Sequence, residues 1–233
     1  MSASLRAAGN TTTSAATLNL VADVPAGTVD GDVMIGILWF NDNTAVLTAG
    51  AGWTLVPNSR VNHSAIVLGV ALYYKVASSE GPTETIATSN NNQQYTGMIL
   101  TYRSDAATVP VEAMASLENA LVGANITCPA ISTQFVNEPL ILTVGNLQNC
   151  DFSGPSGFTE RQDATGPTNT LSSAVYTGTG LTIGSQDAQT VVATVAGAAL
   201  GLQLSIAPSR VLTEQVVPLT LMDIQVLSLA IVG

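Results

Sequence analysis

Two apolar stretches, Asp32-Val33-Met34-Ile35-Gly36 and Pro139-Leu140-Ile141-Leu142-Thr143, decide the fold of this chain. After a loop, each is followed by a small residue, a glycine, an aromatic residue and a threonine, in Ala51-Gly52-Trp53-Thr54 and Ser156-Gly157-Phe158-Thr159. The offset between the two copies is roughly one hundred residues, which is the mark of an internal repeat. The chain is therefore expected to contain two similar β units.

The same order and offset continue beyond these motifs. Ala71-Leu72-Tyr73-Tyr74 is echoed by Ala174-Val175-Tyr176-Thr177, and Gly97–Tyr102 is echoed by Gly201–Ile206. A half-buried sheet does not stay in water with its apolar side exposed, so the apolar faces of the two units must meet. Two antiparallel sheets that pack face to face form a β-sandwich.

Short runs of β-branched and aromatic residues alternate with Pro and Gly turns along both units, which predicts an all-β fold. Only residues 109–122 come near a helical period, so a short helix or a turn is expected there. The expected strands are 17–24, 32–40, 52–56, 65–76, 84–88 and 96–102 in the first unit and 124–131, 140–144, 158–161, 170–177, 187–195 and 199–206 in the second.

The sandwich domain is expected to span residues 17–208, with the repeat units at 17–104 and 124–208. Residues 1–16 are small and polar and have no strong period, which predicts a flexible N-terminal arm. Residues 209–233 are expected to form an apolar C-terminal β tail. Because a free segment of that kind is prone to aggregate, it is expected to pack on its own domain or to add to a partner as a strand.

The charge of the chain argues against several classes of partner. Of 233 residues, 9% are charged and 46% are hydrophobic, and the formal net charge at pH 7 is −10. The six basic residues are scattered singly, whereas nucleic acid and anionic lipid require clustered cations. The sequence also has no apolar run that would span a bilayer and no signal peptide. We therefore expect no nucleic-acid or membrane partner, and synthesis in a cytoplasm.

The sequence has no nucleophile elbow, phosphate-binding loop or zinc-protease motif, so no enzymatic activity is expected. His63, the single histidine, lies in a polar linker and is expected to be solvated. Asp30 and Asp32 flank a glycine as in a turn, and two carboxylates are far fewer than calcium requires, so no metal or other cofactor is expected. Cys128 and Cys150 can form a disulfide only if the fold brings them together. In a reducing compartment, two buried free thiols are favoured over a disulfide.

Aromatic and amide side chains are the candidates for binding. Trp53 is expected to close the end of a core, and the alternative is a platform for a sugar ring. Strand alternation turns either Trp39 or Phe40 outward, and that ring is a candidate for an interface. The candidate glycan contacts are Trp53 and the polar run Asn90, Asn91, Asn92 and Gln93, which is expected in a loop between two strands. The candidate interface includes, besides Trp39 and Phe40, the tail residues Leu219, Leu221, Met222, Ile224, Val226, Leu227 and Leu229.

Several scaffold motifs resemble a known family. Gly31-Asp32-Val33-Met34-Ile35, Ala51–Val56, Tyr73–Ala77, Thr101–Arg103 and Ser156–Arg161 are similar to β-sandwich domains of tailed-bacteriophage virion proteins, and related domains occur in bacterial surface proteins. The resemblance covers residues 12–208. It implies a jelly-roll-like sandwich that serves as a structural or binding module of a virus particle, and it carries over no catalytic residue.

This resemblance leads to two functional expectations. The first is a capsid decoration (cement) protein that clamps neighbouring subunits of the major capsid protein and forms a dimer or trimer with itself under local capsid symmetry. The second is a tail-associated module that binds a bacterial surface glycan. The apolar tail favours the first, because a soluble glycan binder has no use for it. Both expectations place the protein in a virion that is assembled in the cytoplasm of a bacterial host.

Overall fold

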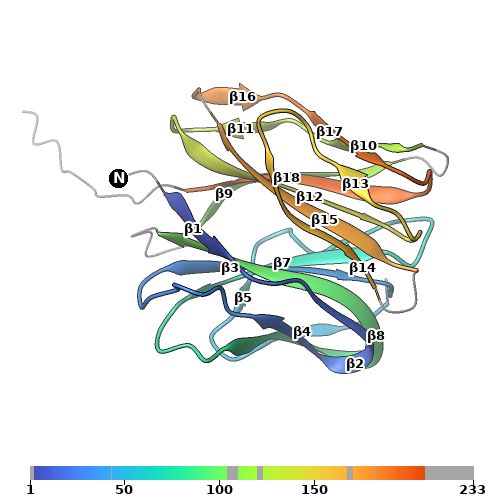
Figure 1. Cartoon of the computed structure of the whole chain (residues 1–233), viewed down its shortest axis with the longest axis horizontal. Coiled ribbons are helices and arrows are strands. Elements are labelled where there is room, and N and C mark those ends of the chain that lie inside the picture. The colour runs from blue at the N-terminus through green and yellow to red at the C-terminus, as the bar shows by residue number, and fades with distance from the viewer. Residues whose placement is uncertain are drawn as a thin grey trace, which may run out of the picture.

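The chain is built from β-strands arranged in two layered units. The computed structural model describes residues 3–42, 44–103, 110–119, 123–166, 170–180 and 182–207, and every regular element in these ranges is a strand. Residues 3–103 form one unit and residues 110–207 form the other, which appear as the lower and upper halves of Figure 1. The prediction of an all-β sandwich with two similar halves is confirmed.

One long strand, β8, organises the first unit. The C-terminal part of β8 pairs with β3 and β1, and its N-terminal part pairs with β2 and β4. The sheet has the order β1-β8-β3-β7-β5, and β6 pairs with β7. The strands of this unit are β1 (Ser4–Ala8), β2 (Thr12–Asp23), β3 (Val33–Phe40), β4 (Leu47–Ala49), β5 (Thr54–Leu55), β6 (Val61–Asn62), β7 (Gly69–Val76) and β8 (Thr83–Arg103).

The second unit contains a five-stranded sheet with the order β14-β15-β12-β18-β9. A smaller sheet, β10-β17-β13, packs on its outer face, and β11 pairs with β16. The strands are β9 (Val111–Asn119), β10 (Asn125–Cys128), β11 (Ile131–Thr133), β12 (Glu138–Asn146), β13 (Phe152–Ser153), β14 (Thr159–Thr165), β15 (Ser172–Gly180), β16 (Gly184–Gln186), β17 (Gln189–Ala193) and β18 (Ala199–Ile206).

The two units repeat one topology. The central strand β12 lies between β15 and β18, as β3 lies between β7 and β8. The second layers also correspond, because β17 pairs with β10 and β13 as the N-terminal part of β8 pairs with β2 and β4. The units differ in one respect: β8 is continuous, whereas β17 and β18 are separate strands.

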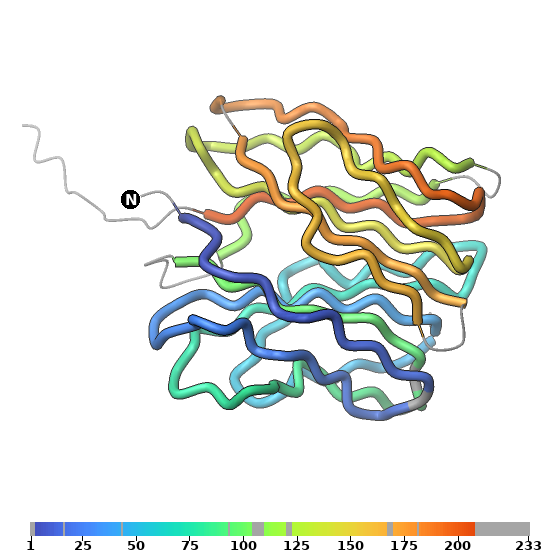
Figure 2. The backbone as a smooth tube through the Cα atoms, viewed as in Figure 1, coloured from blue at the N-terminus to red at the C-terminus, as the bar shows by residue number. Residues whose placement is uncertain are grey.

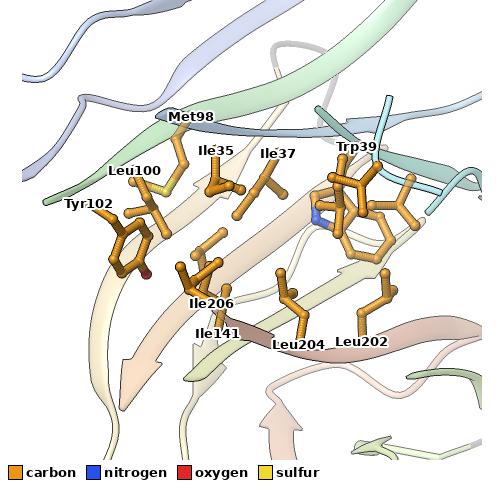
Figure 3. Close-up of a cluster of buried hydrophobic side chains, with 14 of the residues drawn as sticks. Ile35, Ile37, Trp39, Met98, Leu100, Tyr102, Ile141, Leu202, Leu204 and Ile206 are labelled. Atoms are coloured by element: carbon orange, nitrogen blue, oxygen red, sulfur yellow. The ribbon is translucent and has the colours of Figure 1, made fainter. Parts of the chain in front are cut away.

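The main core lies between the two units. Ile35, Ile37 and Trp39 of β3 face Leu202, Leu204 and Ile206 of β18 across it, as Figure 3 shows. All six side chains are fully buried. The indole nitrogen of Trp39 donates a hydrogen bond to Thr143 Oγ1 at 2.8 Å and thereby joins the units through a polar contact inside the core.

Each unit also has a core of its own behind its main sheet. Alternate residues of β3, including Met34, Leu38 and Phe40, pack against β2 and the N-terminal part of β8. In the second unit, Leu142 and Val144 of β12 pack against β10 and β17. Both faces of β3 and of β12 are therefore covered, which explains why these strands read as continuous apolar runs.

The expectation of a flexible arm over residues 1–16 is wrong for residues 4–16. Ser4–Ala8 and Thr12–Asp23 pair in sequence along β8, from Ser4 opposite Arg103 to Asp23 opposite Thr83 (Figure 2). Ala3 and Leu5 join the main core. A polar, small-residue segment is held here by backbone hydrogen bonds along a sheet edge, and such bonds require no apolar period in the sequence.

Two other expectations about local structure are also wrong. Residues 89–94 form no loop between two strands, because β8 runs through them without interruption. Residues 111–119 are the edge strand β9 and not a helix, since pairing with β18 stabilises the strand, whereas a short helix is only marginally stable in water. The expected C-terminal tail, 209–233, lies outside the described residues.

The contact between Gly145 and Trp39 gives a test of the main core. A Cβ on Gly145 would overlap the Trp39 ring, so Gly145→Ala is expected to lower the free energy of unfolding by about 1–3 kcal/mol. The melting temperature measured by calorimetry should fall by roughly 2–10 °C. Gly81→Ala is the matched control, because a Cβ there would meet nothing nearer than the Thr83 carbonyl oxygen at 3.8 Å. Equal melting temperatures for the two variants would contradict this account.

Candidate functional site

The structure buries both rings of the predicted strand-end interface. Trp39 and Phe40 have no exposed surface, because Trp39 lies in the main core and Phe40 lies in the core of the first unit. Arg60 stacks on the Phe40 ring at 4.7 Å from its centroid and covers it further. The expectation that one of the two rings faces outward is wrong, since it assumed that only one face of the strand is covered.

Trp53 closes the end of a core. Its side chain is 5% exposed and packs within the core of the first unit, close enough to Gly36 that a Cβ there would touch the ring. The indole nitrogen donates a hydrogen bond to Glu84 Oε2 at 3.2 Å. Because the ring is buried, it offers no platform for a sugar, and the alternative prediction that Trp53 contacts a glycan is wrong.

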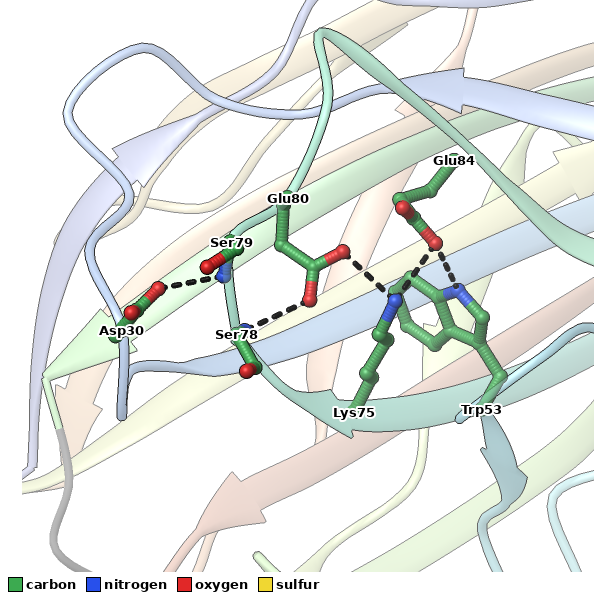
Figure 4. A network of polar contacts seen from close by, with 7 residues as sticks. All are labelled: Asp30, Trp53, Lys75, Ser78, Ser79, Glu80 and Glu84. Carbon is green, nitrogen blue, oxygen red and sulfur yellow. Dashed lines mark hydrogen bonds and ion pairs between the residues drawn. The ribbon is translucent and has the colours of Figure 1, made fainter.

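Glu84 belongs to a polar network beside Trp53 (Figure 4). Lys75 Nζ donates to Glu84 Oε2 at 2.9 Å and to Glu80 Oε2 at 2.7 Å. Glu80 Oε1 accepts from the Ser78 backbone nitrogen at 2.8 Å, and a neighbouring carboxylate, Asp30, accepts from the Ser79 nitrogen at 2.6 Å. The network therefore ties the turn after β7 to the start of β8.

The single cation of this network, Lys75, is shared by two carboxylates. Burial lowers the pKa of Lys75, but the hydrogen bonds to Glu80 and Glu84 outweigh burial, and the net pKa is raised. Burial raises the pKa of Glu80, but the hydrogen bonds from Lys75 and Ser78 outweigh it, and the net pKa is lowered. A lysine held in its protonated form is a poor nucleophile. The arrangement is therefore suited to holding the turn in place.

The four amide residues of the predicted glycan loop lie in the middle of β8. The Asn90 side-chain oxygen accepts a hydrogen bond from the Val46 backbone nitrogen at 2.8 Å, and Asn91 Nδ2 donates to Asp42 Oδ2 at 3.4 Å. Asn90, Asn91 and Asn92 are exposed, and Gln93 pairs with Thr17 of β2. The hydrogen bonds of Asn90 and Asn91 lead to the segment before β4, whereas that of Trp53 leads to Glu84.

The tail residues of the candidate interface, Leu219 to Leu229, lie outside the described ranges. The part of the chain that the structure does describe includes no helix that could cross a membrane. Within the same ranges, no three or more His, Cys, Asp or Glu side chains are grouped so as to hold a metal ion.

One link between the units was not expected from the sequence. His63 is 4% exposed, so the prediction of a solvated histidine is wrong. Its Nδ1 accepts a hydrogen bond from the Ala65 nitrogen at 3.1 Å and lies 3.7 Å from Glu118 Oε2 of β9. Ser64 Oγ donates to the same Glu118 oxygen at 2.5 Å, and this bond lowers the pKa of Glu118. Because Glu118 lies in the other unit, no local sequence motif predicts this contact.

Comparison of this chain with protein-family models, with curated proteins and with solved structures finds no match.

The Lys75 network predicts a pH-dependent loss of stability. Because the pKa of Glu80 is lowered from 4.5 on folding, its ionised form stabilises the native state above that pH, and this contribution is lost as the pH falls through the folded pKa. Glu80→Gln should lower the free energy of unfolding at pH 7 by about 2 kcal/mol, measured by urea denaturation. The difference from the parent should shrink below about pH 4. Asp187→Asn is the control, and a Glu80→Gln effect that does not vary with pH would contradict the interpretation.

Cys128 and Cys150 are free and buried in the core of the second unit, as favoured from the sequence. Burial raises the pKa of the Cys128 thiol to about 12 and that of the Cys150 thiol to about 11. Since the thiolate is the reactive form, neither should react with Ellman's reagent in the native protein at pH 8, and both should react in guanidinium chloride. Rapid reaction of either thiol in the native state would show that the core opens readily.

Proposed function

We propose that this chain is a non-enzymatic structural protein of a tailed-bacteriophage virion, and specifically a capsid decoration protein that clamps neighbouring capsid subunits. Its partners are the major capsid protein and further copies of itself. It is made in the cytoplasm of a bacterial host and reaches its place by assembly on the particle.

The observation that carries this proposal is the apolar sequence that follows the sandwich. Described residues within 3–207 form three hydrophobic cores, and the central strands β3 and β12 are buried on both faces. The sequence continues with an apolar stretch from Leu219 to Val232, interrupted by Asp223. In this proposal, the apolar side chains of that stretch bury against a partner, as a clamp requires.

The copy number of the protein in purified particles tests the proposal. Quantitative mass spectrometry is expected to give a molar ratio to the major capsid protein of order one, because a decoration protein occupies every equivalent position of the lattice. A few copies per particle would overturn decoration and assign the protein to the tail. Absence from particles would overturn a virion role altogether.

Deletion of residues 210–233 separates docking from folding. Because the proposal assigns those residues to docking on the particle, the truncated protein is expected to keep its melting temperature within about 2 °C. It should no longer attach to particles that lack the protein, whereas the full chain should attach. A large fall in melting temperature would show that the tail belongs to the fold of its own domain and would contradict the proposal.

A further inference from the structure

A groove lies between the two units at one end of the main core. It has a volume of about 650 Å³ and is lined by β1 and the end of β8 from the first unit and by β14, β15 and the start of β12 from the second. Binding sites for small molecules commonly have volumes of about 300–1,000 Å³ and lie at interfaces between domains. The groove therefore has the size and the position of a ligand site.

The core-facing positions become polar where the core meets this groove. Along β15, Val175 packs in the main core, while Thr177 and Thr179, the next residues on the same face, line the groove. Thr159, opposite Thr177 on β14, and Asn137 before β12 also line it. Hydroxyl and amide groups thus take the place of aliphatic side chains, as expected where a polar ligand is held.

Tyr102 is a buried polar group at the base of this groove. Its side chain has no exposed surface, and its hydroxyl has no hydrogen-bond partner among the described residues. Burial raises the pKa of this hydroxyl, so it remains a hydrogen-bond donor at any physiological pH. A buried hydroxyl without a partner destabilises a protein, and a ligand acceptor would remove this penalty.

Arg161 supplies a positive charge in the groove. It is the extra residue of a β-bulge in β14, between Glu160 opposite Tyr176 and Gln162 opposite Val175. Bulges re-aim side chains next to binding sites. Nε of Arg161 donates to Thr177 Oγ1 at 2.8 Å, which anchors one edge of the guanidinium and leaves its terminal nitrogens for other partners.

Arg161 has no carboxylate partner of its own among the residues with described positions. Arg6 pairs with Asp32, and Lys75 pairs with Glu80 and Glu84, whereas Arg103 and Arg161 have no carboxylate oxygen within 4.0 Å, and of these two only Arg161 lines the groove. With a net charge of −10, acidic side chains far outnumber basic ones. An exposed guanidinium that lines a groove can bind an external anion through two parallel hydrogen bonds.

We propose that this groove binds a carboxylate-bearing sugar, such as a uronic acid unit of an acidic polysaccharide. The carboxylate pairs with Arg161, and the sugar hydroxyls bond to Tyr102, Asn137 and the threonines. A single cation matches one carboxylate, and the hydroxyl-rich lining suits a polyhydroxylated ligand better than an acidic peptide. The proposal concerns residues 3–207 alone and does not depend on whether the protein decorates the capsid.

Calorimetric titration of the full chain with galacturonic acid and its oligomers, and with the matching neutral galactose series, tests this proposal. The acidic sugars should bind saturably, and the neutral sugars should bind at least tenfold more weakly. Arg161→Gln should weaken binding of the acidic sugar about ten- to hundredfold, since a charge-assisted hydrogen-bonded pair is lost. Arg103→Gln is the control, because it removes the same charge from a residue outside the groove and should change affinity less than twofold.

Two further variants distinguish a loss of binding from a loss of folding. Tyr102→Phe keeps the ring in the core and removes only the unpartnered hydroxyl, so it should weaken binding without lowering the melting temperature. Thr179→Val removes an exposed hydroxyl of the lining and should act in the same direction. Equal binding of acidic and neutral sugars, equal loss in Arg161→Gln and Arg103→Gln, or no binding at all would each overturn the proposal. Tighter binding of a peptide through its C-terminal carboxylate would replace the sugar with a protein partner.

Discussion

Burial of the central strands on both faces is the constraint on which this structure depends. β3 and β12 carry apolar side chains on each side, so each needs a layer in front and a layer behind. The front layers satisfy one another in the main core, where Trp39 reaches Thr143. The rear layer of each unit comes from its own strands: β2, β4 and the N-terminal part of β8 in the first unit, and β10, β13 and β17 in the second. Neither unit could present a stable outer surface with only one of these layers.

The sequence was sufficient to predict the fold class and the repeat, because both follow from the spacing of apolar runs and glycines. It predicted most of the strands, including both central ones. It did not predict that Trp39 and Phe40 are both buried, since alternation says which residues share a face and not whether that face is covered. It also missed β1 and the start of β2, whose polar residues are held by backbone pairing with β8 and leave no apolar signal.

The site residues were harder to predict for a related reason. Trp53 was placed correctly at the end of a core, but its partner Glu84 lies in another strand that only the fold brings near. His63 meets Glu118 across the unit boundary. Tyr102 and Arg161 come from different units, and each reads in the sequence as an ordinary strand residue. Interactions of this kind depend on how the two units pack against each other, and the local spacing of residues in the sequence does not encode this packing.

The continuity of β8 has a mechanical consequence. Its 21 residues pair with β2 in one layer of the first unit and with β3 in the other. Separation of these two layers would therefore require β8 to lose its hydrogen bonds to one of these strands. In the second unit, the corresponding backbone is divided between β17 and β18, with five residues between them that belong to neither strand. The outer sheet of the second unit is therefore joined to its main sheet through an irregular connection, whereas the two layers of the first unit share one unbroken strand.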